Sequence, residues 1–174
     1  MKYWPVPDSY FKQIPAKGSP GSFWENRGDR FHCGVDIYAP ENSNVYSIEK
    51  GKVKEIGIFT SPKIVKYWNK TLYVIIKGAS GLFYKYAEMS STYVNVDETI
   101  EAGQLIGHIG LVLNSKKINE KSPEYIKRIK EKGKLSMLHL ELYDRKPFKN
   151  NKYIGGNWFH KIKPKTLLDP NKVL

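Results

Sequence analysis

The sequence predicts a mainly β fold, a compact antiparallel β domain of 174 residues with one inserted helix. Residues 72–77 and 82–87 are rich in β-branched and aromatic side chains and flank a glycine-containing turn at 78–81, as in a β-hairpin. Residues 136–143 alternate strictly between leucines and other side chains, which is the period of a strand. Residues 123–132 carry the end signals of a helix.

A chain of this length suits a single domain with a substantial buried core. Residues 1–30 contain too many prolines and glycines for a helix or a central strand, so we expect an irregular arm. Aromatic side chains along this arm, such as Trp4 and Trp24, should hold it against the domain formed by residues 31–174.

The β pattern continues on both sides of the hairpin at 72–87. Residues 45–48 and 53–58 are joined through the turn-like residues 49–52, which predicts another hairpin. Residues 90–110 again place apolar positions between turn-forming residues, and we expect short strands there. The sheet should therefore be antiparallel.

Alternation within the second strand of the hairpin places Glu88 on the same face as Tyr84 and Tyr86. This arrangement sets a carboxylate at the end of an aromatic row. Glu88 is either a functional acid at this position or a solvated strand end.

The helix signals lie at both of its ends. Ser122 is a good N-cap, Pro123 suits the first helical position, and Gly133 stands where a terminating glycine belongs. The apolar stripe formed by Ile126 and Ile129 is narrow, so the helix should pack loosely with its lysines in water.

A histidine and an aspartate four residues apart, His32 and Asp36, form a candidate half of a metal site. On an extended chain they would lie about 13 Å apart, whereas zinc ligands each come within about 2.0 to 2.2 Å of the ion. Gly34 can fold the chain back between them because it tolerates positive φ. Cys33 faces away and is interpreted as a small buried residue. The alternative is a partly buried histidine and a surface aspartate beside a turn.

A third ligand can come from residues 136–143, where the leucine face should belong to the core. A histidine on the opposite face of a well-packed strand is rigidly aimed, as a metal ligand must be. That opposite face carries Met137, His139, Glu141 and Tyr143.

The composition favours polyanionic partners, because 29 Lys and Arg against 17 Asp and Glu give a formal net charge of +12. Nucleic acid is disfavoured, since the lysines are scattered and no zinc-finger, RRM or KH signature is present. No apolar run is long enough for a transmembrane segment, and the first residues lack the apolar stretch of a signal peptide. The single cysteine excludes an internal disulfide, and oligomeric state is not indicated.

The order of these motifs resembles the lysostaphin-type, LytM-like zinc endopeptidases, which cut peptide cross-links in bacterial peptidoglycan. The likeness runs from about residue 28 to 143 and includes DRFHCGVDIYAP at 29–40, YAEMS at 86–90, GQLIG at 103–107 and HLE at 139–141. It implies an antiparallel β domain with a narrow groove over Zn2+, a peptidoglycan or peptide substrate, and an extracytoplasmic location in periplasm or cell wall. An anionic cell-wall polymer is then a further candidate partner.

The resemblance also implies the metal ligands. In the family, zinc is held by the His and Asp of H-x-x-x-D and by the second His of H-x-H, which fall on His32, Asp36 and His139. An alternative alignment makes His139 the first histidine and Glu141 the ligand. The family motif continues with an apolar residue and then Glu, which matches Leu140 and Glu141, so we prefer the first alignment.

The two other histidines of the family, which act in catalysis, fall on Glu88 and Met137. A glutamate can serve as the general base, as in H-E-x-x-H metalloproteases. Met137 can neither move a proton nor donate a hydrogen bond, so its role is empty unless Tyr143, Tyr86 or another neighbour fills it.

Residues 114–134 replace a short loop of the family and should lie on the groove rim, where they narrow access, attract an acidic substrate, or only decorate the domain.

The resemblance and its two altered catalytic positions leave two functions open. The first is a zinc-dependent endopeptidase that uses Glu88 in place of the usual histidine. The second is a catalytically silent zinc-binding domain that recognises cell wall or regulates another hydrolase.

Overall fold

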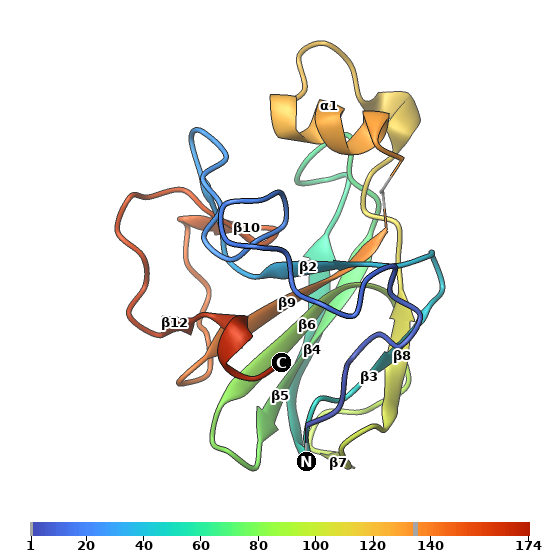
Figure 1. Cartoon of the computed structure of the whole chain (residues 1–174), viewed down its shortest axis with the longest axis vertical. Coiled ribbons are helices and arrows are strands. Elements are labelled where there is room, and N and C mark those ends of the chain that lie inside the picture. The colour runs from blue at the N-terminus through green and yellow to red at the C-terminus, as the bar shows by residue number, and fades with distance from the viewer. Residues whose placement is uncertain (1, 134–135) are drawn as a thin grey trace.

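The computed structural model describes residues 2–133 and 136–174. Its centre is an antiparallel sheet with the strand order β12-β9-β6-β5-β4-β7, onto which β2 pairs at β9 and β8 pairs at β6 (Figure 1). A small second sheet has the order β1-β11-β10. The predicted mainly β, antiparallel fold is confirmed. The strands are β1 Phe31–His32, β2 Val35–Tyr38, β3 Asn44–Tyr46, β4 Gly51–Thr60, β5 Thr71–Gly78, β6 Phe83–Thr92, β7 Thr99–Ile100, β8 Leu105–Ile109, β9 Met137–Tyr143, β10 Tyr153–Ile154, β11 Asn157–Trp158 and β12 Leu167–Leu168.

One predicted hairpin is confirmed and the other is wrong. β5 and β6 pair as expected, with Lys77 opposite Phe83. β3 pairs instead with β8, and β4 pairs with β5 and β7. The reason lies at Ser47, whose backbone N–H and C=O bond to Gln104 and Gly103, so the chain leaves β3 toward that loop and does not turn back.

The core lies on one face of the main sheet. Leu138, Leu140 and Leu142 of β9 are at most 1% exposed and pack in one cluster with Tyr84 and Tyr86 of β6. The predicted leucine face is therefore confirmed. Because successive strand residues face opposite sides, the other face of β9 carries its polar side chains toward the candidate site.

The N-terminal arm is tied to the sheet by backbone hydrogen bonds. The Tyr3 N–H donates to the Ile48 carbonyl oxygen, and the Pro5 carbonyl oxygen accepts from Tyr46. Further along, the Gly21 carbonyl oxygen accepts from the Asp36 N–H at 2.8 Å. This last bond brings the end of the arm beside β2 and the candidate metal ligands.

The α-helix of the described residues, α1, spans Glu124–Glu131, one residue shorter at each end than predicted. Pro123 takes the N-cap position with extended backbone, while the Ser122 hydroxyl accepts a hydrogen bond from Asn119 and does not cap the helix. The expected loose packing is wrong, because Tyr125 and Ile126 are buried. They belong to a separate apolar cluster with Trp68, Val112, Leu113 and Ile118.

Two short 3-10 helices, Ser115–Lys117 and Pro170–Lys172, complete the secondary structure of the described residues. Figure 1 shows α1 above the sheet, away from both chain ends. No helix in the described residues is long and apolar enough to cross a membrane.

Candidate metal centre

His32 ends strand β1 with its ring fully buried. Its Nδ1 lies 2.8 Å from the Ser22 carbonyl oxygen, an acceptor, so Nδ1 carries the proton of the neutral ring. The lone pair of Nε2 is therefore directed at the opposite side, toward β2 and β9.

His139, at the centre of β9, is held through its other ring nitrogen. Its Nε2 lies 2.9 Å from Glu141 Oε1, so this nitrogen donates to a carboxylate. Glu141 also accepts from the hydroxyls of Tyr143 and Tyr153, and the Lys85 ammonium lies 3.3 Å from it. A carboxylate behind a histidine is a common second layer of metal sites, since it fixes the ring orientation and leaves the other nitrogen for the metal.

Asp36 of β2 lies directly opposite His139 in the sheet. Its Oδ2 is 3.3 Å from the Arg27 guanidinium, which also bonds Glu25 and Asn157. Arg27 comes from the N-terminal arm and is nearly buried. It holds one carboxylate oxygen of Asp36 and leaves Oδ1 facing the two histidines.

Three acceptor atoms therefore converge. His32 Nε2, Asp36 Oδ1 and His139 Nδ1 lie 3.0 Å from one another in every pair. Lone pairs this close repel unless a proton or a cation lies between them. Ligands about 2.0 to 2.2 Å from a tetrahedral zinc ion are about 3.3 to 3.6 Å apart, so a slight expansion accommodates the ion. Two imidazoles and a carboxylate, with all three outer atoms held by second-layer partners, fit zinc.

The shifted pKa values of His139 and Asp36 indicate that the three candidate ligands share a positive charge. Burial lowers the pKa of His139, but the hydrogen bonds that its ring donates to Asp36 and Glu141 outweigh this effect and raise the pKa to about 9. Burial alone would raise the pKa of Asp36, yet His32 and His139 hold it well below its usual range. A metal ion that bound here at neutral pH would replace a proton on His139, and its binding should release that proton.

Gly34 brings His32 and Asp36 together differently from the prediction. Its φ is not among the positive values, so the expected left-handed kink is wrong. A Cβ at this position would lie 2.3 Å from the Leu140 carbonyl oxygen and 3.0 Å from the His139 ring. Glycine is therefore required by close approach to β9. The chain changes direction by leaving the small sheet after β1 and joining the main sheet at β2.

Glu88 reaches the same centre because β6 breaks its alternation. Glu88 has φ of +67°, and the pairing register with β8 shifts between Met89 and Ser91. The predicted common face with Tyr84 and Tyr86 is therefore wrong: the tyrosines are in the core, whereas Glu88 lines the cavity beside His32, Asp36 and His139. Such a backbone costs about 1 to 3 kcal/mol in a residue other than glycine, and it concentrates at functional sites.

The Glu88 carboxyl group is short of partners. Its Oε2 is buried and has no hydrogen-bond partner among the described residues. Burial, and then the charge of Asp36, raise the pKa of Glu88 to about 8. A nearby cation would stabilise the ionised form and lower this pKa. The buried, unpartnered carboxyl oxygen of Glu88 is thus a second feature of this cavity that a bound cation would stabilise.

We expect Glu88→Gln to stabilise the metal-free protein increasingly as pH rises. Because the pKa of Glu88 is about 8 folded and near 4.5 unfolded, the unfolded chain loses this proton first, and stability falls between pH 4.5 and 8. Gln removes this loss. Urea unfolding with a chelator should give the variant an advantage at pH 8 that exceeds its advantage at pH 5 by about 3.5 kcal/mol. Parallel stability curves at all pH values would contradict the inferred environment.

The structure brings Met137 to the same cavity, but not Tyr143 or Tyr86. Met137 is buried and lines the cavity with Glu88. The Tyr143 hydroxyl bonds Glu141 behind His139, and the Tyr86 hydroxyl accepts from the Ile48 N–H in the core. Neither tyrosine can therefore fill the role that Met137 leaves empty.

The insertion closes the centre. The cavity over the three candidate ligands measures about 40 Å³, which holds a few water molecules but no peptide. Tyr125, Ile126 and Ile129 of α1 form part of its wall. The Tyr125 ring also lies 4.9 Å from the Arg27 guanidinium, in a cation–π contact. As a result, none of the three candidate ligands is more than 3% exposed.

Several residues that build this centre were not indicated by the sequence pattern. Ser22, Glu25 and Arg27 lie in the arm, to which only a packing role was assigned. Lys85 and Tyr153 contact Glu141 from distant parts of the chain. Gly156 is also required, since a Cβ there would lie 2.7 Å from the His139 ring. None of these residues stands at a motif spacing.

A family model decides the relationship of the chain. The model of peptidase family M23 matches residues 30–146, two thirds of the sequence, and this span contains all three candidate ligands. The chain belongs to peptidase family M23. The inferred resemblance to the lysostaphin-type members is confirmed. No curated protein sequence matches the chain.

Solved M23 structures share the fold. The catalytic domain of lysostaphin from Staphylococcus simulans is 18% identical, with 88% of each chain covered and a TM-score of 0.53. A mutant catalytic domain of the prophage-encoded M23 protein EnpA from Enterococcus faecalis is 20% identical, with 90% of this chain and 94% of that chain covered and a TM-score of 0.52. A longer protein, a peptidase M23 from Pseudomonas aeruginosa, is 17% identical, with 82% of this chain and 44% of that chain covered and a TM-score of 0.47. This M23 chain thus spans less than half of that longer protein.

Proposed function

We propose that this M23 protein is a zinc-dependent endopeptidase that hydrolyses peptide bonds of peptidoglycan cross-links or of small peptides. The observation that carries the proposal is the convergence of His32, Asp36 and His139 at 3.0 Å, with each outer atom held by a partner. Zinc bound there would polarise a carbonyl oxygen and activate water.

The remaining residues have distinct roles in this proposal. Glu88 Oε2 accepts a proton from the water that attacks the peptide carbonyl carbon, and then gives it to the leaving amine as the C–N bond breaks. Arg27 orients Asp36, and Glu141 orients His139. The resemblance places two catalytic histidines at positions 88 and 137. Glu88 can take over the first role, but Met137 cannot donate a hydrogen bond, so the second role is not filled by the residue at position 137.

The substrate must displace α1, since the closed cavity of about 40 Å³ admits no peptide. In this proposal, the insertion covers the candidate ligands until a substrate binds. Because the apolar cluster of α1 is separate from the main core, the helix can move without unfolding the sheet.

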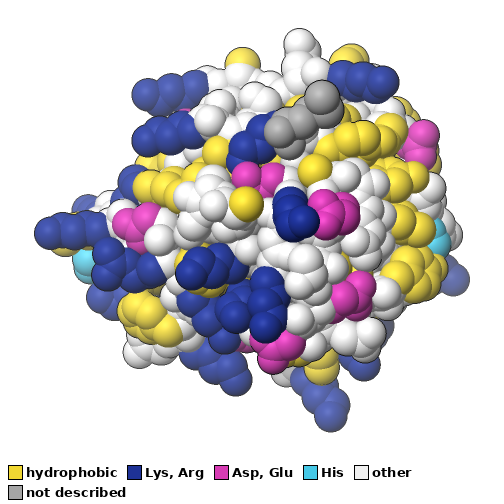
Figure 2. All heavy atoms as spheres, turned by 90° about the horizontal axis from the view of Figure 1, so that it is seen from below, with side chains coloured by type: hydrophobic (Ala, Val, Ile, Leu, Met, Phe, Trp, Pro, Cys, Tyr) yellow, Lys and Arg dark blue, Asp and Glu magenta, His cyan; other side chains and the backbone are white. Residues whose placement is uncertain are grey.

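The positive charge favours an anionic environment for the substrate. Figure 2 shows Lys and Arg side chains gathered over the left and lower parts of the face that lies away from α1, with acidic side chains between them. A net charge of +12 attracts a cell-wall polymer that carries negative charge. This attraction should weaken as ionic strength rises.

A silent zinc-binding domain is the second candidate, and two observations favour it. Met137 lacks proton chemistry, and α1 covers the candidate ligands. Zinc-reconstituted protein incubated with purified muropeptides separates the two functions. New amine termini and shortened cross-links are expected for the endopeptidase, whereas intact muropeptides that still bind the protein would support the silent domain.

A further inference from the structure

The segment between β9 and β12, residues 145–166, is strongly basic and is called the basic loop below. It contains seven Lys and Arg residues and no Asp or Glu. Figure 1 shows this loop in orange and red at the left of the domain, and the left edge of Figure 2 carries Lys and Arg side chains with hydrophobic ones beside them. A surface with this charge attracts a partner of negative charge.

Most cations of the basic loop have no acidic partner. Arg145 pairs with Asp144, and Lys146 pairs with Glu55. The Lys163 ammonium donates to a backbone carbonyl oxygen of β12. The other four cations are exposed and form no ion pair with a described residue: Lys149, Lys152, Lys161 and Lys165.

The same loop leaves large apolar side chains in water. Phe148 and Ile162 are 75% and 73% exposed, the highest values among the exposed large hydrophobic side chains of the described chain. Ile154 of β10 is 38% exposed. Single exposed hydrophobic residues are common on protein surfaces, but three of them in one positively charged loop indicate a binding surface.

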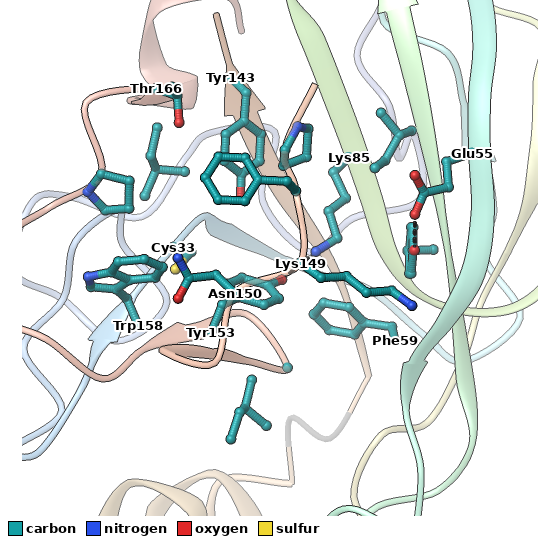
Figure 3. Close-up of a pocket in the computed structure, with 18 of the residues that line it drawn as sticks. Cys33, Glu55, Phe59, Lys85, Tyr143, Lys149, Asn150, Tyr153, Trp158 and Thr166 are labelled. Carbon is teal, nitrogen blue, oxygen red and sulfur yellow. Dashed lines mark hydrogen bonds between the residues drawn. The ribbon is translucent and has the colours of Figure 1, made fainter. Parts of the chain in front are cut away.

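The apolar surface continues onto β4 and the segment that follows it, around a pocket of about 300 Å³. Four exposed apolar side chains line this pocket: Ile58, Ile64, Phe148 and Ile154. Figure 3 shows Lys149 extended toward the Phe59 side of the same pocket, with Trp158 at the other side. Apolar and cationic groups therefore lie next to one another on one surface.

The basic loop is folded, so its exposed side chains are held in place. β10 pairs with β11, and β11 pairs with β1. The Trp158 indole N–H donates to the Ile162 carbonyl oxygen at 2.9 Å. The Tyr153 hydroxyl donates to Glu141 of β9. A surface that is ordered before binding loses less conformational entropy when a partner binds.

A bilayer surface with anionic lipids suits both features of the loop. Anionic headgroups attract lysines that come within about a Debye length. A bulky apolar side chain beside those lysines can enter the boundary between headgroups and acyl chains. A water-soluble polyanion would satisfy the lysines alone, because it would leave Phe148 and Ile162 in water.

We propose that the basic loop docks this M23 protein onto a bilayer surface that contains anionic lipids, with Phe148 and Ile162 inserted among the headgroups and the unpaired lysines against the lipid phosphates. The attachment is peripheral and reversible, because two side chains and a few charges bind far more weakly than a spanning helix. This inference goes beyond the proposed function and does not require hydrolysis.

Sedimentation of the full chain with lipid vesicles tests the docking surface. Vesicles of phosphatidylglycerol and phosphatidylcholine in equal parts should bind the protein at least about tenfold more tightly than vesicles of phosphatidylcholine alone. Phe148→Ser should weaken binding to the mixed vesicles about tenfold. Val96→Ser, at a position that is 53% exposed and outside the loop, should leave this binding unchanged. Equal binding to both kinds of vesicle, or binding to neither, would overturn the proposal.

Two matched double variants test where the charge acts. Lys149→Glu combined with Lys161→Glu reverses two unpaired charges of the basic loop. Lys116→Glu combined with Lys117→Glu makes the same change in net charge in the 3-10 helix before α1. The first pair should weaken binding to the mixed vesicles at least about tenfold more than the second. Equal effects would mean that net charge acts without a docking surface.

Soluble polyphosphate distinguishes a membrane from a polyanion. It should compete with the mixed vesicles for the lysines, and Phe148→Ser should leave polyphosphate binding unchanged because no apolar group is buried there. If Phe148→Ser lowers binding neither to vesicles nor to polyphosphate, the loop recognises charge alone, and an anionic polymer replaces the membrane as its partner.

The outcomes also separate this inference from the proposed function. Binding to the mixed vesicles without cleavage of any muropeptide would refute the endopeptidase and retain the docking loop. Cleavage of muropeptides by a protein that binds no vesicles would refute the docking loop and retain the endopeptidase.

Discussion

Glu88→Gln should lower peptide hydrolysis by about 10² to 10⁴, the usual contribution of a general base, while the zinc content stays the same. Glu88 lines the cavity but is not one of the three candidate metal ligands. The substitution therefore removes a proton acceptor and leaves the ligands intact. Hydrolysis of a muropeptide and metal content are measured on the same samples. Glu41→Gln, at an exposed position, is the matched control.

Met137→His provides the opposite test. Met137 is buried and already lines the cavity, so a histidine there would place a hydrogen-bond donor beside Glu88. We expect faster hydrolysis than in the parent. An active Glu88→Gln variant would refute the general base, and a parent and Met137→His variant that both leave peptides intact would favour the silent domain.

Ile126→Asp should open the centre. Ile126 is 4% exposed in the cluster that holds α1 over the cavity, and a charge there is costly to bury. Each 1.4 kcal/mol that favours the open form is about a tenfold change in population. We expect zinc extraction by a chelator to become at least about tenfold faster, and hydrolysis to increase.

Arg128→Asp introduces the same charge on the exposed side of α1 and should leave both rates near the parent values. The main core does not include α1, so the principal thermal unfolding of Ile126→Asp should change little. If Ile126→Asp and the parent release zinc equally fast, α1 is not the barrier to the centre.

The fold was largely predictable because alternation and turn chemistry are local signals. The leucines of β9 and the β5–β6 hairpin follow directly from period-two patterning. The pairing of β3 with β8 was not predictable, since it depends on bonds from Ser47 to residues more than 50 positions away. Helix α1 was predicted from its caps, but its burial depends on Trp68 and Arg27, which no helical period reveals.

The candidate metal centre was also predictable only in part. The positions of His32, Asp36 and His139 follow from motif spacing and family resemblance, and the structure brings them together. The turn of Glu88 toward them required a left-handed backbone that strand alternation cannot predict. Arg27 and Lys85 were missed because each contacts the centre through tertiary packing alone.

Zinc titration of chelator-treated protein tests the central claim most directly. Calorimetry at pH 7 should give one zinc per chain with release of about one proton, because the pKa of His139 is about 9 in the metal-free protein. His139→Ala and Asp36→Ala should abolish this binding. A parent protein that binds no stoichiometric zinc, or variants that bind it as well as the parent, would contradict the assignment of His32, Asp36 and His139 as a metal centre.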